Sequence, residues 1–240
     1  MSLSILNLIN LLVILYQVIL HFHKVEDEMK TFLASILIIT SIFVKAQSAL
    51  DEVVPVKQLI PDIGLDLRYS TINNFTSQKL YSIDEAYLSI GAINKLKIVH
   101  DSLKQITSYD GISYAQGLGI KIYDGYRPRA VQYLMFEIFP NPVYVADPNT
   151  GSIHNRGGAI DVSIIDMATG QEIPMPTEFE WFGPEASHSY TNLPPNVIAN
   201  RTLLYNMMTQ VGGFIPYDAE WWHYTISGAS SLPLLDFQMK

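Results

Sequence analysis

Two histidines and two carboxylates in the second half of the chain have the residue types of a catalytic metal site. His154 begins the segment HNRGGAID, which places Asp161 seven residues later, and Glu220 and His223 enclose two tryptophans in EWWH. The chain has no cysteine, so histidine and carboxylate side chains must hold any metal ion. His154, Asp161 and His223 would supply two nitrogens and one oxygen, and would leave the fourth position of a tetrahedral zinc ion open for water.

The spacing of these residues restricts how they can meet. On a straight strand, a separation of seven would point His154 and Asp161 to opposite faces. Gly157-Gly158 lies between them and permits a sharp bend, so we expect His154 in a loop and Asp161 on the strand that follows. A separation of three would bring Glu220 next to His223 on a turn.

Two further residues have the chemistry that such a site needs. Because zinc lowers the pKa of a bound water toward about 7, a neighbouring carboxylate can remove its proton. Glu220 is expected to be this general base and to pass the proton to the leaving amine. Arg127, in the DGYRP segment, keeps its charge and presents fixed donors, which suits the stabilisation of an oxyanion.

Each motif also has a structural interpretation. A single histidine before a glycine pair is commonly a turn residue, a single EWWH a strand end with a buried tryptophan, and a single DGYRP a turn with a salt bridge. Their occurrence together favours a catalytic site. His100, on a predicted helix, is expected to be structural. His188 is expected to be structural or to support the ligands, because a fourth protein ligand would close the site.

At these motifs the chain resembles the D-alanyl-D-alanine dipeptidases. The resemblance covers nearly all of the chain after its N-terminal leader and runs through DLRYSTINNFT, DGYRP, SxHxRGxAID, TGxxxPM and EWWHY. The wider SxHxxGxAxD pattern is shared with related carboxypeptidases and hedgehog-type domains, whereas EWWH and DGYRP narrow it to the dipeptidases. The resemblance implies a small α+β domain with one Zn²⁺ per chain. The implied site comprises the metal ligands His154, Asp161 and His223, the base Glu220 and the transition-state arginine Arg127.

The resemblance also implies a substrate pocket. Tyr69 and Ser152 match pocket positions of the family. The family has an aspartate near the substrate ammonium, and the nearest match here is Glu180, which keeps the charge but is one methylene longer. The implied substrate is D-Ala-D-Ala or a similar small D-dipeptide. Two alternatives stay open: a peptidoglycan D,D- or L,D-carboxypeptidase with the same metal chemistry, and a zinc-binding module without catalysis.

The elements that must position these residues follow from the apolar pattern. Strands are expected at 65–69, 118–123, 160–165 and 221–226, and helices at 86–106, 128–138 and 196–211. The longest helix is expected to start from a capping box at Ser82. Because helices cluster apart from strands, we expect one α+β domain, residues 47–240, with a mostly antiparallel sheet.

The N-terminal part has a different character. Residues 2–22 are apolar and about long enough to span a bilayer, and the charged stretch 24–28 follows them. Residues 29–46 then repeat the order of a secretory signal peptide, with Met29-Lys30, an apolar run and a small residue, Ala46, before a plausible cleavage point. We expect residues 1–28 to be an upstream artefact or a membrane segment, and the domain to be periplasmic or otherwise exported. Contact with a membrane is expected only through an uncleaved leader.

Charge excludes one class of partner. The formal net charge is −8, and a nucleic-acid-binding protein would need a basic surface instead. The expected partner is a small dipeptide, and the sequence does not determine the oligomeric state.

Overall fold

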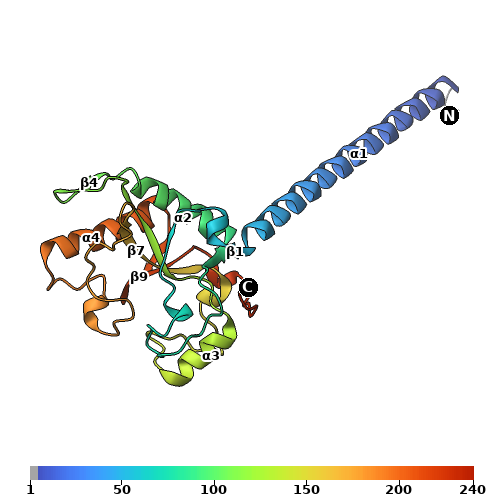
Figure 1. The fold of residues 1–240 in the computed structure, drawn as a ribbon. Coiled ribbons are helices and arrows are strands. Elements are labelled where there is room, and N and C mark those ends of the chain that lie inside the picture. Colours follow the sequence, from blue (N-terminus) through green and yellow to red (C-terminus); the bar gives the residue numbers. More distant parts are fainter. Residues whose placement is uncertain (1–4) are drawn as a thin grey trace. The chain divides into compact units, whose positions relative to one another are not determined.

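The structure is a computed structural model that describes the backbone of residues 5–240, all side chains from residue 49 onward and part of those before it. The chain divides into two compact units, one ending at Ala49 and the other spanning Leu50–Lys240. Helix α1 (Ile5–Leu50) contains the charged stretch and the predicted signal peptide without interruption (Figure 1). Residues 2–4 of the predicted apolar segment lie outside the described residues. Within residues 5–240, no helix combines the length and the apolar character that crossing a membrane requires.

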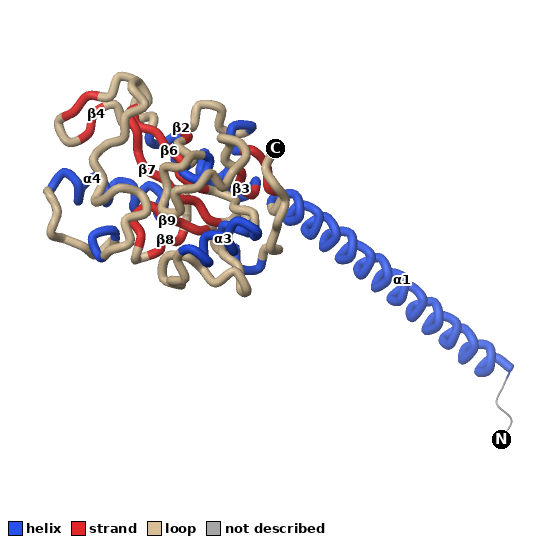
Figure 2. The backbone as a smooth tube through the Cα atoms, turned by 60° about the horizontal axis from the view of Figure 1, so that its bottom comes forward, coloured by secondary structure: helices blue, strands red, loops and turns tan. Residues whose placement is uncertain are grey.

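The second unit is built around a five-stranded sheet with the strand order β2-β6-β7-β9-β8 (Figure 2). Within this sheet β2 and β6 are parallel, and the other three pairs are antiparallel. The fold is therefore the expected α+β domain with a mostly antiparallel sheet. The strands are β2 (Gly64–Leu65), β6 (Leu118–Asp124), β7 (Ala159–Asp166), β8 (Ile215–Tyr217) and β9 (Glu220–Thr225).

Short strand pairs lie outside this sheet. β1 (Val53–Pro55) pairs with β3 (Tyr87–Ser89), and β4 (Ser108–Tyr109) pairs with β5 (Ile112–Ser113), both antiparallel. The β4–β5 connection is Asp110-Gly111, and both residues have positive φ angles of 50° and 77°. A two-residue type I′ hairpin turn requires a positive φ at both of its central residues, so an Asp-Gly pair suits this position.

The helices of the second unit are α2 (Ile90–Leu103), α3 (Arg129–Ile138) and α4 (Pro195–Asn206), the last of which continues into a π-helical turn, Met207–Val211. α3 begins after Pro128, as expected, because proline needs no N–H partner in the first turn. His100 is fully buried on α2, and its Nδ1 accepts a hydrogen bond from the Ile120 N–H of β6 at 3.1 Å. His100 thus joins α2 to the sheet, in line with the structural role expected for it.

Two expected elements were placed wrongly. The strand predicted at 65–69 ends at Leu65, because the chain turns into a 3-10 helix at Arg68–Ser70. The helix predicted at 86–106 begins at Ile90 and ends at Leu103, because residues 87–89 are extended and pair with β1. Its N-cap is therefore Ser89, whose Oγ accepts from the Ala92 N–H, and the predicted capping box at Ser82 does not start it.

The centre of the sheet is covered on both faces. In β7, residues 159–165 are all buried, on both alternating faces of the strand. Trp221 and Trp222 are consecutive in β9 and are also both buried, at 0% and 2% exposure. Strands covered on both faces have little freedom to shift, so side chains that project from them are held in fixed positions.

Candidate active site

The sheet brings two of the predicted metal ligands together. Asp161 of β7 lies directly opposite His223 of β9 in the antiparallel register. His154 lies before β7 in a one-turn 3-10 helix, His154–Arg156, which ends at Gly157 with a φ of 66°. A Cβ at Gly157 would lie 2.5 Å from a Val53 methyl group, so both backbone angle and space require glycine there. The expected bend between His154 and Asp161 is confirmed.

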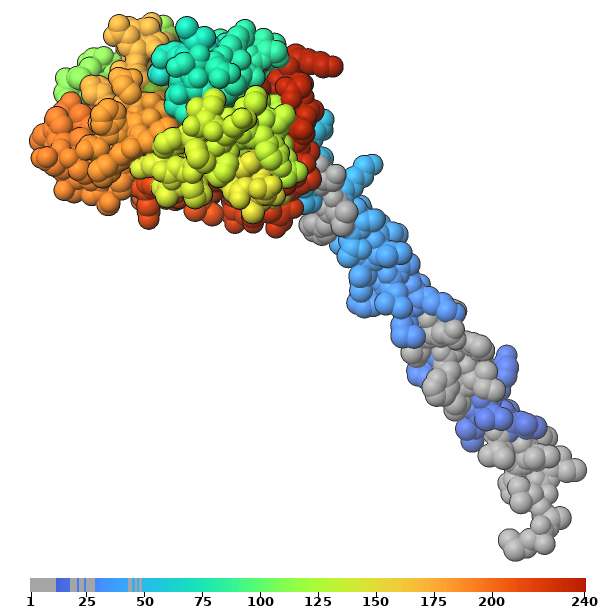
Figure 3. All heavy atoms as spheres, turned by 90° about the horizontal axis from the view of Figure 1, so that it is seen from below, coloured from blue at the N-terminus to red at the C-terminus, as the bar shows by residue number. Residues whose placement is uncertain are grey.

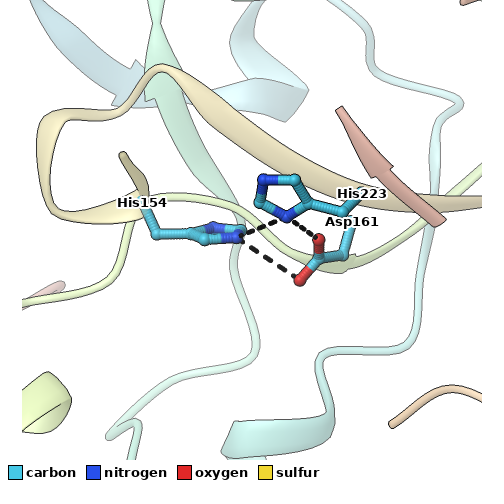
Figure 4. Close-up of side chains that lie close together, drawn as sticks. All are labelled: His154, Asp161 and His223. Carbon is cyan, nitrogen blue, oxygen red and sulfur yellow. Dashed lines mark hydrogen bonds and ion pairs between the residues drawn. The ribbon is translucent and has the colours of Figure 1, made fainter. Parts of the chain in front are cut away.

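The three side chains converge on one point (Figure 4). His223 Nδ1 lies 2.8 Å from Asp161 Oδ1, His154 Nε2 lies 3.5 Å from Asp161 Oδ2, and the two nitrogens are 3.3 Å apart. Ligand atoms at about 2.0–2.2 Å from a tetrahedral zinc ion are roughly 3.3–3.6 Å apart. Two of the three separations match this spacing and the third is shorter, so the three residues are close enough together to hold a single metal ion.

The orientation of His154 is set by the DGYRP segment. His154 Nδ1 lies 2.7 Å from the Gly125 carbonyl oxygen, which makes Nδ1 the protonated nitrogen and leaves the Nε2 lone pair for a metal. The Arg127 N–H donates to the His154 carbonyl at 3.1 Å, and Asn155 Nδ2 donates to the Arg127 carbonyl at 2.8 Å. Two motifs that are distant in the sequence thus form one hydrogen-bonded unit.

Asp161 is buried and ionised. Burial alone would raise its pKa, but the neighbouring imidazoles of His154 and His223 hold it well below the usual aspartate range. An ionised carboxylate between two imidazoles is the form in which all three residues can bind a cation.

The Glu220 carboxylate also lies near the predicted metal ligands, but the backbone geometry that brings it there differs from the prediction. Glu220 and His223 both lie in β9, and not on a turn as expected. The pairing with β8 is irregular here, because Tyr217 is opposite Glu220 whereas Pro216 is opposite Tyr224. Such a bulge re-aims side chains, and Glu220 Oε2 comes within 4.0 Å of His223 Nδ1. Burial raises the pKa of Glu220 to about 8, which suits a group that takes up a proton.

Arg127 is held rigidly at the edge of the site. Its Nε and Nη2 donate to Asp124 Oδ2 at 3.1 and 2.7 Å, and its Nη1 donates to Gln132 Oε1 at 2.8 Å. Its guanidinium lies 5.2 Å from the centre of the Tyr69 ring. Although burial opposes the charge, Asp124 and nearby groups keep the pKa of Arg127 above its ordinary value.

The sequence did not lead us to predict a role for Asp124 or Gln132. Asp124 is fully buried, and besides Arg127 it accepts hydrogen bonds from Tyr81 OH at 2.7 Å and from the Gly125 N–H at 2.9 Å. The sequence signal that could have indicated Asp124 is its position in the DGYRP motif, two residues before the tyrosine. Nothing in the sequence indicated Tyr81 or Gln132, because both contacts depend on the tertiary fold.

One cavity of about 270 Å³ is lined by every residue that the sequence assigned to the site. Aromatic side chains form much of the remaining wall. Tyr144 and Phe182 of this wall stack on each other, and Phe139 stacks on Phe182 from outside the lining. In the space-filling view, the yellow-green chain that contains α3 lies beside the orange chain around residues 175–200 (Figure 3). The assigned residues in the lining are Tyr69, Arg127, Ser152, His154, Asp161, Glu180, Glu220 and His223.

Glu180 also lines this cavity. Its Oε2 accepts a hydrogen bond from the Phe75 N–H at 2.8 Å, and its Oε1 is buried without a hydrogen-bond partner among the described residues. Tyr69 lies beside the carboxylate. Burial raises the pKa of Glu180 to about 7. A half-satisfied buried carboxylate is a place where a cationic donor would be stabilised.

Ser152 and His188 differ in their relation to the cavity. Ser152 lines it, but its Oγ also accepts from the His154 N–H at 3.2 Å and so supports the turn that carries His154. The Ser152 N–H in turn donates a hydrogen bond to Asn155 Oδ1 at 2.8 Å. His188 lies outside this cavity and packs edge-on against Tyr205 and Tyr224, in line with a structural role.

Comparison with known proteins agrees with this geometry. Residues 49–239 match the family model described as D-ala-D-ala dipeptidase. A D-alanyl-D-alanine dipeptidase of Escherichia coli K12 is 36% identical over 185 residues, which cover 77% of this chain and 89% of the relative. Dipeptidases of the same name from Enterococcus faecium and Streptomyces coelicolor are 26% and 28% identical, over 70% and 71% of this chain and 88% and 89% of their own lengths. The match therefore spans the second unit from end to end, and the chain belongs to the D-Ala-D-Ala dipeptidase family of peptidases.

Proposed function

We propose that the chain is a zinc dipeptidase that hydrolyses D-Ala-D-Ala or a similar short D-dipeptide. The observation that carries this proposal is the convergence of His154 Nε2, Asp161 and His223 Nδ1 in the cavity that also contains Glu220 and Glu180. Names of the relatives support the same substrate.

The donor set supports zinc as the metal. Two imidazoles and one carboxylate are borderline ligands of the kind found in catalytic zinc sites, and three protein ligands leave room for water. When bound there, zinc would polarise the peptide carbonyl and lower the pKa of a water toward about 7.

The protein side chains divide the remaining work. Glu220, with a pKa raised by burial, accepts the proton of the attacking water and delivers it to the nitrogen of the leaving amino acid. Arg127 is locked by Asp124 and Gln132 before substrate arrives, so its charge can stabilise the developing oxyanion without reorganisation. Trp222 is buried in the cavity wall and limits the access of other water.

Glu180 supports the dipeptidase over the carboxypeptidase alternative. The half-satisfied Glu180 carboxylate in the cavity wall would pair with a free α-ammonium group. A stem peptide has no free amine at that position, and would leave this carboxylate buried without a cation. Electrostatic complementarity therefore favours a substrate whose amine lies one residue from the scissile bond.

The test is a direct comparison of substrates. Zinc-loaded protein is offered D-Ala-D-Ala, L-Ala-L-Ala and a peptidoglycan stem pentapeptide, and kcat/KM is measured for each. We expect D-Ala-D-Ala to be cleaved fastest. Faster cleavage of the stem peptide would replace the dipeptidase by the carboxypeptidase, and inertness toward all three would favour a binding module.

We also propose that residues 29–46 are a cleaved signal peptide and that the enzyme acts outside the cytoplasm. The support is the order of a short basic start, an apolar run and a small residue at the cleavage point. Intact-mass measurement of the exported protein should give an N-terminus at Gln47. An N-terminus upstream of Met29 would contradict the proposal.

A further inference from the structure

The part of the cavity wall that contains Glu180 is supported by contacts that begin outside the cavity, at Glu172. Glu172 follows the turn after β7 and is bridged back to Ile165 of that strand. Its carboxylate accepts hydrogen bonds from Ser163 Oγ at 2.6 Å, from Lys121 Nζ at 2.6 Å and from Tyr123 OH at 2.5 Å. These donors lie on β6 and β7, so Glu172 ties the Tyr123 side chain to the centre of the sheet.

Phe179, which lines the cavity, and Arg68, which does not, both lie against the ring of Tyr123. Phe179 stacks on it, with centroids 4.5 Å apart and an angle of 18° between the planes. The Arg68 guanidinium also lies over this ring, 5.1 Å from its centre. Phe179 immediately precedes Glu180, and Arg68 immediately precedes Tyr69. A shift of the Tyr123 ring would therefore reach Glu180 and Tyr69, which both line the cavity.

Glu180 needs this support because its backbone is strained. Its φ is 66°, a left-handed conformation that disfavours residues with a Cβ. Such a conformation persists only where the surroundings determine it. Phe179 is fixed between the stacked Tyr123 ring and Trp222, whose ring it meets edge-on at 5.3 Å. The neighbour of the strained residue is thus clamped between two buried rings.

We propose that Glu172 and Tyr123 are positioning residues for substrate binding: they clamp Phe179, and the clamp keeps Glu180 in the conformation that presents its carboxylate to the substrate amine. This inference rests on the proposed role of Glu180 as the amine anchor. Neither Glu172 nor Tyr123 lines the cavity, so they act through Phe179 and not by touching substrate.

The variants Tyr123→Phe and Glu172→Gln test the clamp with minimal changes of shape. Matched controls are Tyr133→Phe on the exposed side of α3 and Glu178→Gln, an exposed carboxylate next to Phe179. Kinetics are measured on full-length zinc-loaded protein with D-Ala-D-Ala and with its N-acetyl derivative, which has no ammonium group. We expect KM for D-Ala-D-Ala to rise roughly three- to tenfold in the two test variants, with kcat within about twofold of wild type.

The preference for the free amine is the measurement that a general loss of stability would not change. In the test variants, the ratio of kcat/KM for the free over the acetylated dipeptide should fall toward one, while zinc content and both controls match wild type. Phe179→Leu, which removes the stack directly, should reproduce this fall even if Tyr123→Phe lowers the yield of folded protein.

Two results would overturn the inference. If wild type prefers the free amine and the test variants keep its KM and its ratio, the clamp has no role although Glu180 does. If wild type shows no preference for the free amine, the proposed role of Glu180 fails, and the inference fails with it.

Discussion

Two parts of the cavity wall, called here the metal end and the amine end after their proposed roles, are built in opposite ways. At the metal end, Asp161 and His223 project from the buried centre of the sheet in direct register, and His154 is fixed by a hydrogen bond to Gly125. At the amine end, Glu180 lies in an irregular segment at a strained backbone angle. Under the proposed function, the residues of the chemical step lie on buried strands or are hydrogen-bonded next to them, whereas the residue proposed to recognise the substrate amine lies in an irregular segment.

The largest effect is expected at the metal end. Glu220→Ala should lower kcat by about 10²–10⁴-fold, the usual contribution of a general base, and should leave zinc binding intact. Steady-state kinetics together with metal analysis check both parts. A variant that loses zinc as well would make Glu220 a ligand or a structural residue.

A slightly smaller effect is expected from Arg127→Lys. Lysine keeps the charge but cannot reproduce the three hydrogen bonds to Asp124 and Gln132, so the donor would no longer be fixed. We expect kcat to fall by about 10²–10³-fold, as on removal of one oxyanion donor. If KM rose while kcat stayed at the wild-type value, Arg127 would belong to the binding end instead.

Substitution of Glu180 at the amine end should change KM for the dipeptide. Glu180→Gln removes the charge, and a hydrogen bond to a charged group contributes about 1.5–3 kcal/mol, so KM for D-Ala-D-Ala should rise roughly 10- to 100-fold. Glu180→Asp is the matched variant, because it keeps the charge and introduces the residue that the family resemblance implies near the substrate ammonium. Its KM should stay close to wild type; a rise as large as that of the glutamine variant would show that reach matters more than charge.

The pH dependence should separate the two ends further. Burial raises the pKa of Glu180 to about 7, so below this pH the carboxyl group is protonated and loses its attraction for the substrate ammonium. KM should therefore rise as the pH falls through about 7. In Glu180→Gln this rise should disappear, and a wild-type profile in that variant would assign the titration to another group.

The smallest effect is expected at the bend that connects the ligands. Gly157 and Gly170 have similar φ angles, 66° and 71°, but an added Cβ would meet Val53 at Gly157 and nothing within 4 Å at Gly170. Gly170→Ala should cost about 1–2 kcal/mol of stability through backbone strain alone. Gly157→Ala should cost more and should also lower activity through His154. Thermal unfolding checks the difference, and equal losses would remove the steric argument.

The metal end could be predicted from the sequence, and the amine end only in part. Residue type restricts which side chains can hold a cation, and Gly157 signalled the bend between His154 and Asp161. The bulge that turns Glu220 toward His223 was missed, because it depends on how β8 pairs with β9. The strain at Glu180 and its support by Glu172 were missed for a similar reason, since they join segments that no local pattern connects. The misplaced start of α2 likewise follows from pairing with β1, which overrides helical spacing.

The most direct test of this account is a crystal structure of the zinc-loaded protein with an anomalous difference map collected at the zinc edge. We predict one strong peak per chain, at about 2.0–2.2 Å from His154 Nε2, from His223 Nδ1 and from an Asp161 oxygen, with no fourth protein ligand. A map without a peak among these three residues would contradict the account, and so would an ion whose fourth position is closed by Glu220.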